Sequence, residues 1–313
     1  MVNRIPNPHF PIPNSQFPLV SIIVTTKNEE RNIANCLKSI LNSQFPIPNP
    51  QFPVSNSQSS LEVIVVDNNS TDCTKEIVTE SEKWLAPLNV QIFNGGPERS
   101  AQRNFGIKKA SSKYILYLDA DMILSENVIS ECVGKFNKWE KENGKRELAA
   151  LYIPEEIIGE GFGVKVRDFE RSFYNATCID CVRFVLRDKF LEIGGFDETL
   201  TGPEDWDFDR RIKKVGKVDI VNVPIYHNEG EFNLKEYLSK KSYYSKSFNK
   251  YIDKWGKDDK IVKKQLGFWY RYFGVFVENG KWRKMLWHPV LTMRMYALRV
   301  MVGVQYLPRI RKS

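Results

Sequence analysis

Several familiar signatures are missing from this sequence of 313 residues. No G-x-G-x-x-G follows the first apolar run and no G-x-x-x-x-G-K-[ST] occurs anywhere, so neither a dinucleotide-binding fingerprint nor a P-loop is supported. No apolar run reaches the roughly 18 residues that a membrane-spanning helix needs. These absences exclude the commonest nucleotide-binding motifs and make a spanning helix unexpected.

Cysteine and histidine are scarce. The five cysteines are an odd number, and with no secretory signal recognised they favour a reducing, cytoplasmic location. Cys178 and Cys181 form a lone C-x-x-C, which is half of a zinc site, and we expect ordinary thiols. Among three histidines, His9 lies in a Pro-rich leader and His288 in a basic segment, whereas His227 follows an apolar run. His227 is equally open to a structural role and to metal binding.

Acidic residues are absent after Glu278. The whole chain has a net charge of +8, and its basic character favours an anionic partner such as a nucleotide, a nucleic acid or lipid headgroups. The basic residues that follow Glu278 are Lys281, Arg283, Lys284, Arg294, Arg299, Arg309, Arg311 and Lys312. The C-terminal part is therefore predicted to face the anion.

Two short segments share an unusual composition. "FPIPNSQFP" (10–18) returns as "FPIPNPQFP" (45–53), and both are rich in Pro, Asn, Gln and Ser. Two copies with isolated apolar residues cannot build a repeat architecture, because each unit must bury a face against its neighbour. We expect a flexible leader at 1–18 and a loop insertion at 42–60.

The rest of the N-terminal region alternates apolar runs with helical patterns. The predicted strands cover 19–26, 61–67, 90–93 and 113–121, and a helix is expected after each of the first three. Asn28 is predicted to cap the first helix. Near-continuous apolar strands separated by helices predict an α/β fold, with a doubly wound, mostly parallel central sheet flanked by helices.

Polar residues follow three of these strands, in "TTKNE" (25–29), "DNNS" (67–70) and Asp119-Ala120-Asp121. Ligands of such sheets bind beyond the carboxyl ends of the strands, where these side chains would converge. Two aspartates one residue apart suit either a solvated turn or a cation site. Convergence favours the cation, because Mg²⁺ or Mn²⁺ would let a carboxylate crevice accept a nucleoside diphosphate.

A second acidic stretch, "GPEDWDFDRR", is typical of a helix N-terminus, where the helix dipole favours carboxylates. That structural interpretation suits Asp207 and Asp209. Glu204 and Asp205 remain available for chemistry, and Trp206 is either an acceptor platform or a packed core residue.

Four segments in this order resemble family 2 glycosyltransferases of the GT-A fold: "VSIIVTTKNEERNI", "VIVVDNNSTDCT", "RNFGIKKASSKYILYLDADM" and "GGFDETLTGPEDWDFDRRIKKVG". The resemblance covers 19–230 as a catalytic domain. It implies inverting transfer of a hexosyl-type sugar from a UDP- or GDP-sugar to an acceptor hydroxyl, with Mg²⁺ or Mn²⁺. The chain departs from the common pattern at Thr25 and Lys27, where many relatives have Pro and Tyr, and in the insertion at 42–60.

The resemblance also implies roles for individual residues. The nucleotide would be held by Thr25, Lys27, Glu29, Asp67, Arg103, Asp119 and Ala120. The metal of this DxD motif would be bound by Asp121, with Asp119 in the ribose or metal region. His227 matches the position of a metal-binding histidine in some relatives, and Glu229 is a weaker candidate. Asp205 would be the catalytic base, with Glu204 beside it.

The segment 231–313 is predicted to form a basic, aromatic helical extension. Its last part, from "MLWHPV" on, has the composition of an interfacial helix on an anionic membrane, and equally that of a packed helix with a solvated basic face. A membrane position would suit a lipid-linked acceptor or a cell-surface glycan precursor.

Two other functions compete with the glycosyltransferase. A nucleotide-sugar pyrophosphorylase would need a Gly-rich loop after the first strand, and "TTKNEE" has no glycine. A nucleic-acid-binding protein would explain the basic C-terminal region but not the converging carboxylates, which would repel phosphates. We therefore expect a glycosyltransferase that does not bind nucleic acid.

Overall fold

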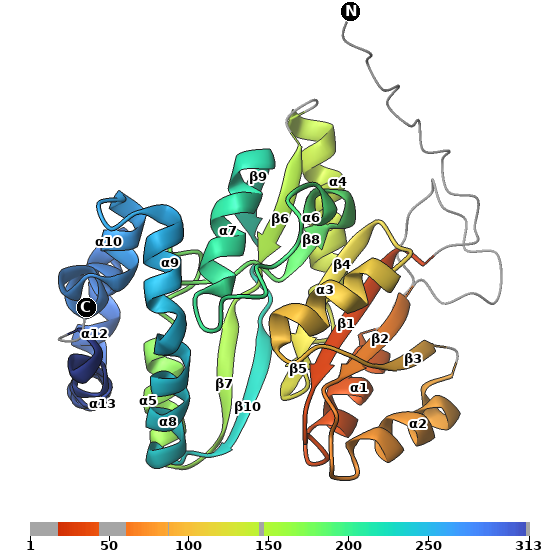
Figure 1. Ribbon diagram of the computed structural model, residues 1–313, viewed down its shortest axis with the longest axis horizontal. Helices are drawn as coiled ribbons and strands as arrows, with labels where there is room; N and C mark the ends of the chain where they lie inside the picture. Colours follow the sequence, from red (N-terminus) through yellow and green to blue (C-terminus); the bar gives the residue numbers. More distant parts are fainter. Residues whose placement is uncertain (1–17, 44–60, 87, 144–146, 311–313) are drawn as a thin grey trace, which may run out of the picture.

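The computed structural model describes most of the chain (Figure 1). The described ranges are 18–43, 61–86, 88–143 and 147–310. Apart from their edges, the predicted leader and the predicted insertion lie outside the described residues.

The central sheet has seven strands in the order β3-β2-β1-β4-β8-β6-β9. All neighbouring pairs are parallel except those of β8, which runs antiparallel to β4 and β6. The bounds are β1 Val20–Thr26, β2 Leu61–Asp67, β3 Asn89–Asn94, β4 Tyr114–Asp119, β6 Leu148–Tyr152, β8 Phe184–Leu186 and β9 Lys217–Ile220. The predicted mostly parallel sheet is confirmed.

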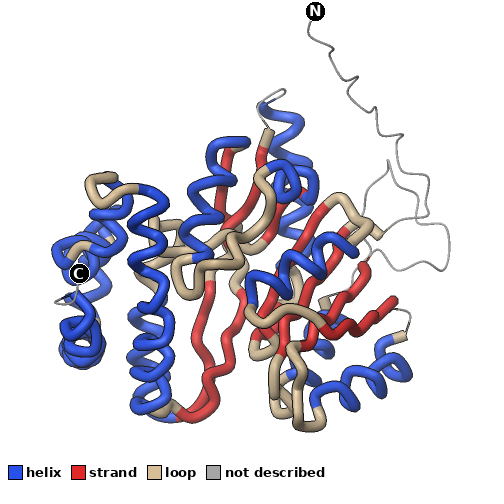
Figure 2. The backbone as a smooth tube through the Cα atoms, viewed as in Figure 1, coloured by secondary structure: helices blue, strands red, loops and turns tan. Residues whose placement is uncertain are grey.

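Helices cover both faces of this sheet (Figure 2). Because successive strand side chains point to opposite faces, Ile22 and Val24 of β1 join one core and Ile23 joins the other. The first core packs α1 Ile33–Asn42, α2 Thr74–Leu85 and α4 Val128–Asn143, and the second packs α3 Arg99–Lys109, α6 Arg187–Glu192 and α7 Glu204–Val215. The predicted doubly wound arrangement follows directly from this alternation.

The predicted cap of the first helix is wrong. Helix α1 begins at Ile33 after Asn32, well beyond Asn28. Asn28 has a positive φ of 55° and joins two strand-end loops instead. Its backbone N–H donates to Ser70 Oγ and its Oδ1 accepts from the Thr71 N–H, each at 2.8 Å. The side chain that would have capped the helix is used to tie the β1 loop to the β2 loop.

A second, smaller sheet connects the end of β4 to later parts of the chain. Its order is β5-β10-β7, with β5 Met122–Leu124, β10 Ile225–Glu231 and β7 Glu155–Glu160. Strand β10 is antiparallel to β5 and parallel to β7. His227 therefore lies opposite Met122 on one side and Ile157 on the other. This sheet places His227 beside the DxD motif.

The C-terminal extension is helical, as predicted. Its main helices are α8 Leu234–Tyr244, α9 Phe248–Trp255, α10 Lys260–Leu266, α12 Trp282–Trp287 and α13 Pro289–Ile310, with the short α11 Val275–Val277 between α10 and α12. Helix α13 packs on α8 and on α5 Gly161–Arg171, burying Met295 and Leu298 against Phe173 and Phe276. These helices lie on the side of the molecule away from β3 and α2 (Figure 1). None of the helices in the described ranges has both the length and the apolar character to cross a membrane.

Candidate active site

The ends of β1 and β4 meet as expected. Thr25 lies opposite Asp119 in the ladder, and its hydroxyl donates to Asp119 Oδ1 at 3.0 Å. The Ala120 N–H donates to the Thr25 carbonyl at 3.1 Å. Parallel strands bring their carboxyl ends to one edge of the sheet, which is why residues almost a hundred positions apart touch here.

Asp119 lies in an arginine cluster. Arg103 Nη2 is 3.0 Å from Asp119 Oδ1, while Arg99 Nη1 and Arg183 Nη1 are 3.7 and 3.9 Å from Oδ2. Burial raises the pKa of Asp119, but Arg103, Arg99 and Arg183 outweigh it and hold that pKa well below its usual range. Asp119 is therefore a firmly ionised carboxylate with its charge already neutralised.

Arg103 joins the two acidic motifs. Its side chain comes from α3, is 1% exposed, and places Nη1 3.0 Å from Asp205 Oδ1 as well as Nη2 on Asp119. The guanidinium lies 5.0 Å from the ring centroid of Tyr117 and 5.2 Å from that of Phe196. Burial disfavours the cation, but the two carboxylates outweigh burial and raise the pKa of Arg103. The planar, two-pronged guanidinium thus fixes Asp119 relative to Asp205.

Glu204 and Asp205 open helix α7 but differ in environment. Glu204 is 2% exposed, its Oε1 accepts from Arg99 Nη2 at 3.2 Å, and its Oε2 has no partner among the described residues. Burial and then Asp205 raise the pKa of Glu204. The Asp205 side chain is 21% exposed, so of the two it is the better placed to meet an acceptor.

The next acidic residues are structural, as the helix interpretation suggested. Asp207 accepts from Arg211 Nε at 2.8 Å, and Asp209 accepts from Lys213 Nζ at 2.7 Å, each within α7. Trp206 is half-buried and stacks on an aromatic ring of α9. It therefore packs the C-terminal extension onto α7, on one face of the central sheet.

Asp121 and His227 form a pair on the other side of the DxD motif. His227 Nε2 is 3.1 Å from Asp121 Oδ2, and His227 Nδ1 is 3.1 Å from Glu155 Oε1. Burial lowers the pKa of His227, but Asp121 and Glu155 outweigh it and raise the pKa to about 10. The second oxygen of Asp121, Oδ1, is buried and has no partner among the described residues. A buried carboxylate oxygen without a partner is costly, so it marks a place where a ligand would be stabilising.

Sequence reasoning missed Glu155. This buried carboxylate accepts from Arg183 Nη2 at 3.2 Å and faces Arg171 Nε at 3.4 Å, in addition to His227. Burial raises its pKa, but Arg171, His227 and Arg183 outweigh burial and hold it well below the usual range. The sequence held a signal for it, because "PEE" follows the apolar run "LAALYI" (148–153) much as the two aspartates follow the apolar run of β4.

The residues around Asp121 suit a divalent cation. A carboxylate oxygen and a neutral imidazole nitrogen are ligands that Mn²⁺ accepts: Asp121 Oδ1 is free to bind, whereas His227 would have to release the proton of Nε2 and its contact with Asp121. In the described part of the chain no group of three His, Cys, Asp or Glu gathers to hold a metal, so donor phosphate oxygens and water would complete the shell. The other two candidate ligands already contact arginines: Asp119 contacts Arg103, and Glu229 accepts from Arg167 Nη2 at 3.1 Å.

The remaining predicted nucleotide contacts are differently placed. Asp67 is fully buried, and both its oxygens accept from Ser70, Oδ2 from the N–H at 2.8 Å and Oδ1 from the hydroxyl. Glu29 Oε2 accepts from Asn32 Nδ2 at 2.8 Å, and burial raises the Glu29 pKa. Lys27 is exposed at the end of β1. A hollow of about 800 Å³, lined by Asn32 and the turn from β10 into α8, opens nearby.

The cysteines behave as ordinary thiols. All five are free, and Cys178 and Cys181 do not form a disulfide with each other. Burial raises the pKa of both thiols.

Comparisons with known proteins point to one family. Residues 21–143 match the family model for glycosyl transferase family 2. The chain is 34% identical over 107 residues to glycosyltransferase AglE of Haloferax volcanii, covering 34% of this chain and 32% of that relative. It is 30% identical over 200 residues to the GalNAc(5)-diNAcBac-PP-undecaprenol beta-1,3-glucosyltransferase of Campylobacter jejuni, covering 60% of this chain and 57% of the relative. The match thus spans less than two thirds of the length of these relatives.

Two solved structures share the fold. The mannosyltransferase PcManGT of Pyrobaculum calidifontis, solved with GDP-Man and Mn²⁺, aligns with a TM-score of 0.59 at 18% identity, over 94% of this chain and 89% of its own. Staphylococcus aureus TarS, solved with UDP-GlcNAc, aligns with a TM-score of 0.53 at 18% identity, over 82% and 73%. At this identity the likeness establishes the fold alone.

Proposed function

This chain carries the family 2 glycosyltransferase pattern over residues 21–143, and we propose that it transfers a hexosyl-type sugar from a nucleotide-diphosphate sugar to an acceptor hydroxyl with inversion. The resemblance to that family and to the GT-A fold, stated from the sequence, is confirmed. The single observation that carries the proposed reaction is that the two aspartates of the motif have different partners: Asp121 contacts His227, whereas Asp119 is joined through Arg103 to Asp205.

The donor would be a UDP- or GDP-sugar with Mg²⁺ or Mn²⁺. Asp121 and His227 would hold the ion, and Asp119 would lie at the ribose or at a water of the ion, because both its oxygens face arginines. When bound, the ion would neutralise the departing diphosphate. The two similar solved structures contain bound donors, GDP-Man with Mn²⁺ in one and UDP-GlcNAc in the other, which supports a donor of this class.

The chain's own polar residues would position the nucleotide. Thr25, Lys27 and Glu29 follow β1 directly, and the exposed ammonium of Lys27 is suited to a phosphate. Asp67 is buried with both oxygens bound to Ser70, and Arg103 is buried with Nη1 and Nη2 on the two carboxylates, so we propose that they act by fixing the loop after β2 and those carboxylates.

Asp205 would be the base that takes the proton of the acceptor hydroxyl. One of its oxygens is bound to Arg103, which leaves the other for the acceptor, and Asp205 lies in the first turn of α7, where the helix dipole is positive. Glu204 would support it from behind, since Glu204 is buried and anchored by Arg99. Attack from the face opposite the leaving diphosphate gives inversion.

The acceptor would be a lipid-linked glycan or a cell-surface glycan precursor. The Campylobacter jejuni relative is named for an undecaprenol-linked acceptor, and a further relative, from Nostoc, is named beta-monoglucosyldiacylglycerol synthase and is 26% identical over 270 residues, 80% of this chain and 53% of the relative. Both names contain a lipid, which supports a lipid-linked acceptor, and we propose that the protein acts on the cytoplasmic face of a membrane.

Thermal unfolding of the purified protein with UDP, GDP and their sugar conjugates, with and without Mn²⁺, tests the donor site. A ligand that binds the native state raises the midpoint. We expect a shift that requires both Mn²⁺ and one nucleotide, that disappears in Asp121→Ala, and that persists in the matched surface variant Asp258→Ala, whose side chain is 80% exposed. A well-folded protein that no nucleotide stabilises under any metal condition would contradict the proposal.

A further inference from the structure

We propose that helices α12 and α13 dock this protein on an anionic phospholipid bilayer, through an exposed apolar stripe bordered by unpaired cations. The proposal rests on the proposed function in one respect only: a lipid-linked acceptor gives the docking its purpose. The surface itself is argued from exposure and charge.

Exposed apolar side chains gather in the C-terminal extension. Of the eighteen large apolar side chains that are exposed in the described ranges, thirteen lie at or after Ile261. The most exposed are Trp287 at 81%, Trp269 at 76%, Leu286 at 71% and Met293 at 66%. Scattered exposed apolar residues are ordinary, but such a concentration on one part of the surface marks an interaction site.

These side chains form a stripe along α13. Its members, which we call the apolar stripe, are Val290, Met293, Ala297, Val300 and Val304, all exposed and spaced three or four residues apart. That spacing puts them on one face of the helix. Met295 and Leu298, on the other face, are buried against α5 and α8. Helix α13 is therefore apolar on two faces, of which the protein itself covers one.

The charge around the stripe indicates what covers the second face. Arg283, Lys284 and Arg294 are exposed, and no carboxylate of the described residues lies within ion-pair distance of them. A second copy of the chain would bring the same cations against each other without an acidic counterpart. An anionic lipid surface instead supplies both negative headgroups and an apolar layer. Charge complementarity thus favours the bilayer.

Tryptophans border the surface. Trp282 and Trp287 lie in α12 and are 43% and 81% exposed, and Trp269 precedes the π-helical turn Tyr270–Gly274. Indole rings prefer the boundary between headgroups and acyl chains, because they combine an apolar body with an N–H donor.

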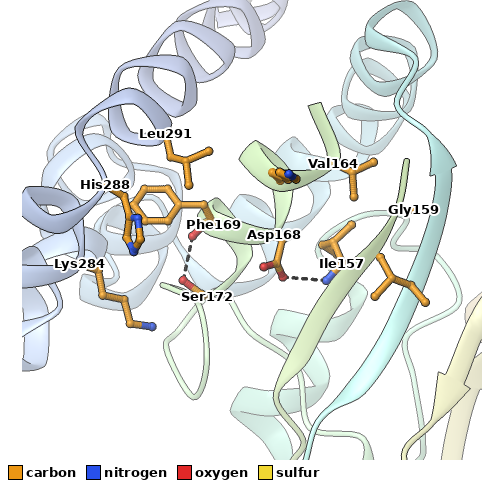
Figure 3. Close-up of a pocket in the computed structure, with 11 residues that line it drawn as sticks. Ile157, Gly159, Val164, Asp168, Phe169, Ser172, Lys284, His288 and Leu291 are labelled. Atoms are coloured by element: carbon orange, nitrogen blue, oxygen red, sulfur yellow. Dashed lines mark hydrogen bonds between the residues drawn. The ribbon is translucent and has the colours of Figure 1, made fainter. Parts of the chain in front are cut away.

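A groove of about 650 Å³ adjoins this surface (Figure 3). Lys284, His288 and Leu291 line it from the C-terminal helices, and Phe169 and Ile157 line it from the catalytic domain. Asp168 also lines the groove, but its Oδ1 already accepts from the Ile157 N–H at 2.9 Å. Lys165 also lines the groove, which thus combines two amines with apolar walls and suits the phosphate and first methylenes of a lipid headgroup.

The groove lies close to the proposed metal pair. Ile157 pairs with His227 in the ladder of β7 and β10, so the groove wall and the metal side of the site are adjacent strands of one sheet. A bilayer held at α12 and α13 would therefore present a lipid-linked acceptor on the same side of the molecule as β7.

Sedimentation with vesicles tests the proposal on the full chain. Vesicles of phosphatidylcholine alone are compared with vesicles of equal parts phosphatidylcholine and phosphatidylglycerol. We expect binding to the anionic vesicles, weakened roughly tenfold or more in Arg283→Glu/Arg294→Glu, because each cation contributes to attraction. The apolar variant Met293→Asp/Val300→Asp should also lose binding, whereas Leu191→Asp, at an exposed apolar site of α6, should keep it.

Other outcomes overturn the proposal. Equal binding of the wild type and both double variants, or no binding to anionic vesicles, would remove the docking surface. A dimer that forms without vesicles and dissociates in Met293→Asp/Val300→Asp would assign the stripe to a second copy. Nucleotide-dependent thermal stabilisation, measured in parallel, separates the two proposals. Vesicle binding without nucleotide binding would support the docking surface and contradict the proposed glycosyltransferase activity. Nucleotide binding without vesicle binding would support the activity and contradict the docking surface.

Discussion

The two aspartates of the DxD motif stand one residue apart but face two different regions. On the arginine side, Asp119 meets Arg103, Arg99 and Arg183, and every oxygen has a cationic neighbour. On the histidine side, Asp121 meets only His227 and keeps one buried oxygen without a partner among the described residues. A carboxylate that is already neutralised contributes to the architecture, whereas one that lacks a partner is prepared for a ligand.

The largest expected effect lies on the arginine side, at the proposed base. Asp205→Asn keeps the size of the side chain but removes the proton acceptor, and we expect activity to fall roughly a thousandfold. Release of nucleoside diphosphate in the presence of acceptor measures this, with the donor that the thermal screen identifies. Donor-dependent stabilisation should persist in the variant. If the Asp205→Asn protein stays active, Asp205 is not the catalytic base, and the distinction between the arginine side and the histidine side is weakened.

The second prediction sharpens the contrast between the aspartates themselves. In metal-free buffer, Asp119→Asn should lower the free energy of unfolding by about 3 kcal/mol, because it leaves buried arginines without their carboxylate. Asp121→Asn should lower it by less, about 1 to 2 kcal/mol, since it weakens the single contact of Oδ2 with His227 while Oδ1 has no partner to lose. Urea unfolding of both variants measures the difference. Similar losses in the two variants would contradict the separation into an architectural and a ligand-binding carboxylate.

The smallest effect is expected on the histidine side, at Glu155. We propose that Glu155 is a positioning residue, which holds His227 Nδ1 so that Nε2 faces the ion. Glu155→Gln should weaken Mn²⁺ binding roughly 10- to 100-fold, as carboxylates behind metal-binding histidines do elsewhere. Titration of free Mn²⁺ followed by electron paramagnetic resonance measures this directly. The neighbouring exposed Glu156→Gln is the matched control, and equal Mn²⁺ affinity in the two variants would make Glu155 purely structural.

Local patterns predicted much of the fold correctly. The apolar runs became β1, β2, β3 and β4, and the acidic stretch after Pro203 became the start of α7. The polar strand ends were expected to converge, and Thr25 does contact Asp119. The cap at Asn28 failed, because a competing partner, the loop after β2, took its side chain. Propensity indicates where a helix can begin, but tertiary partners decide which polar side chain caps it.

The alternation of strands and helices and the position of carboxylates at strand ends could be predicted from the sequence alone. Both depend on burial and on periods of a few residues, which a chain displays locally. The contacts by which Arg103 joins Asp119 to Asp205 and Glu155 holds His227 arise from tertiary packing. Those contacts join residues from 16 to 102 positions apart, and their directions depend on how separate elements pack. Side-chain orientation across packed elements leaves no periodic trace in a sequence, so the residue types were visible while their division into two regions was not.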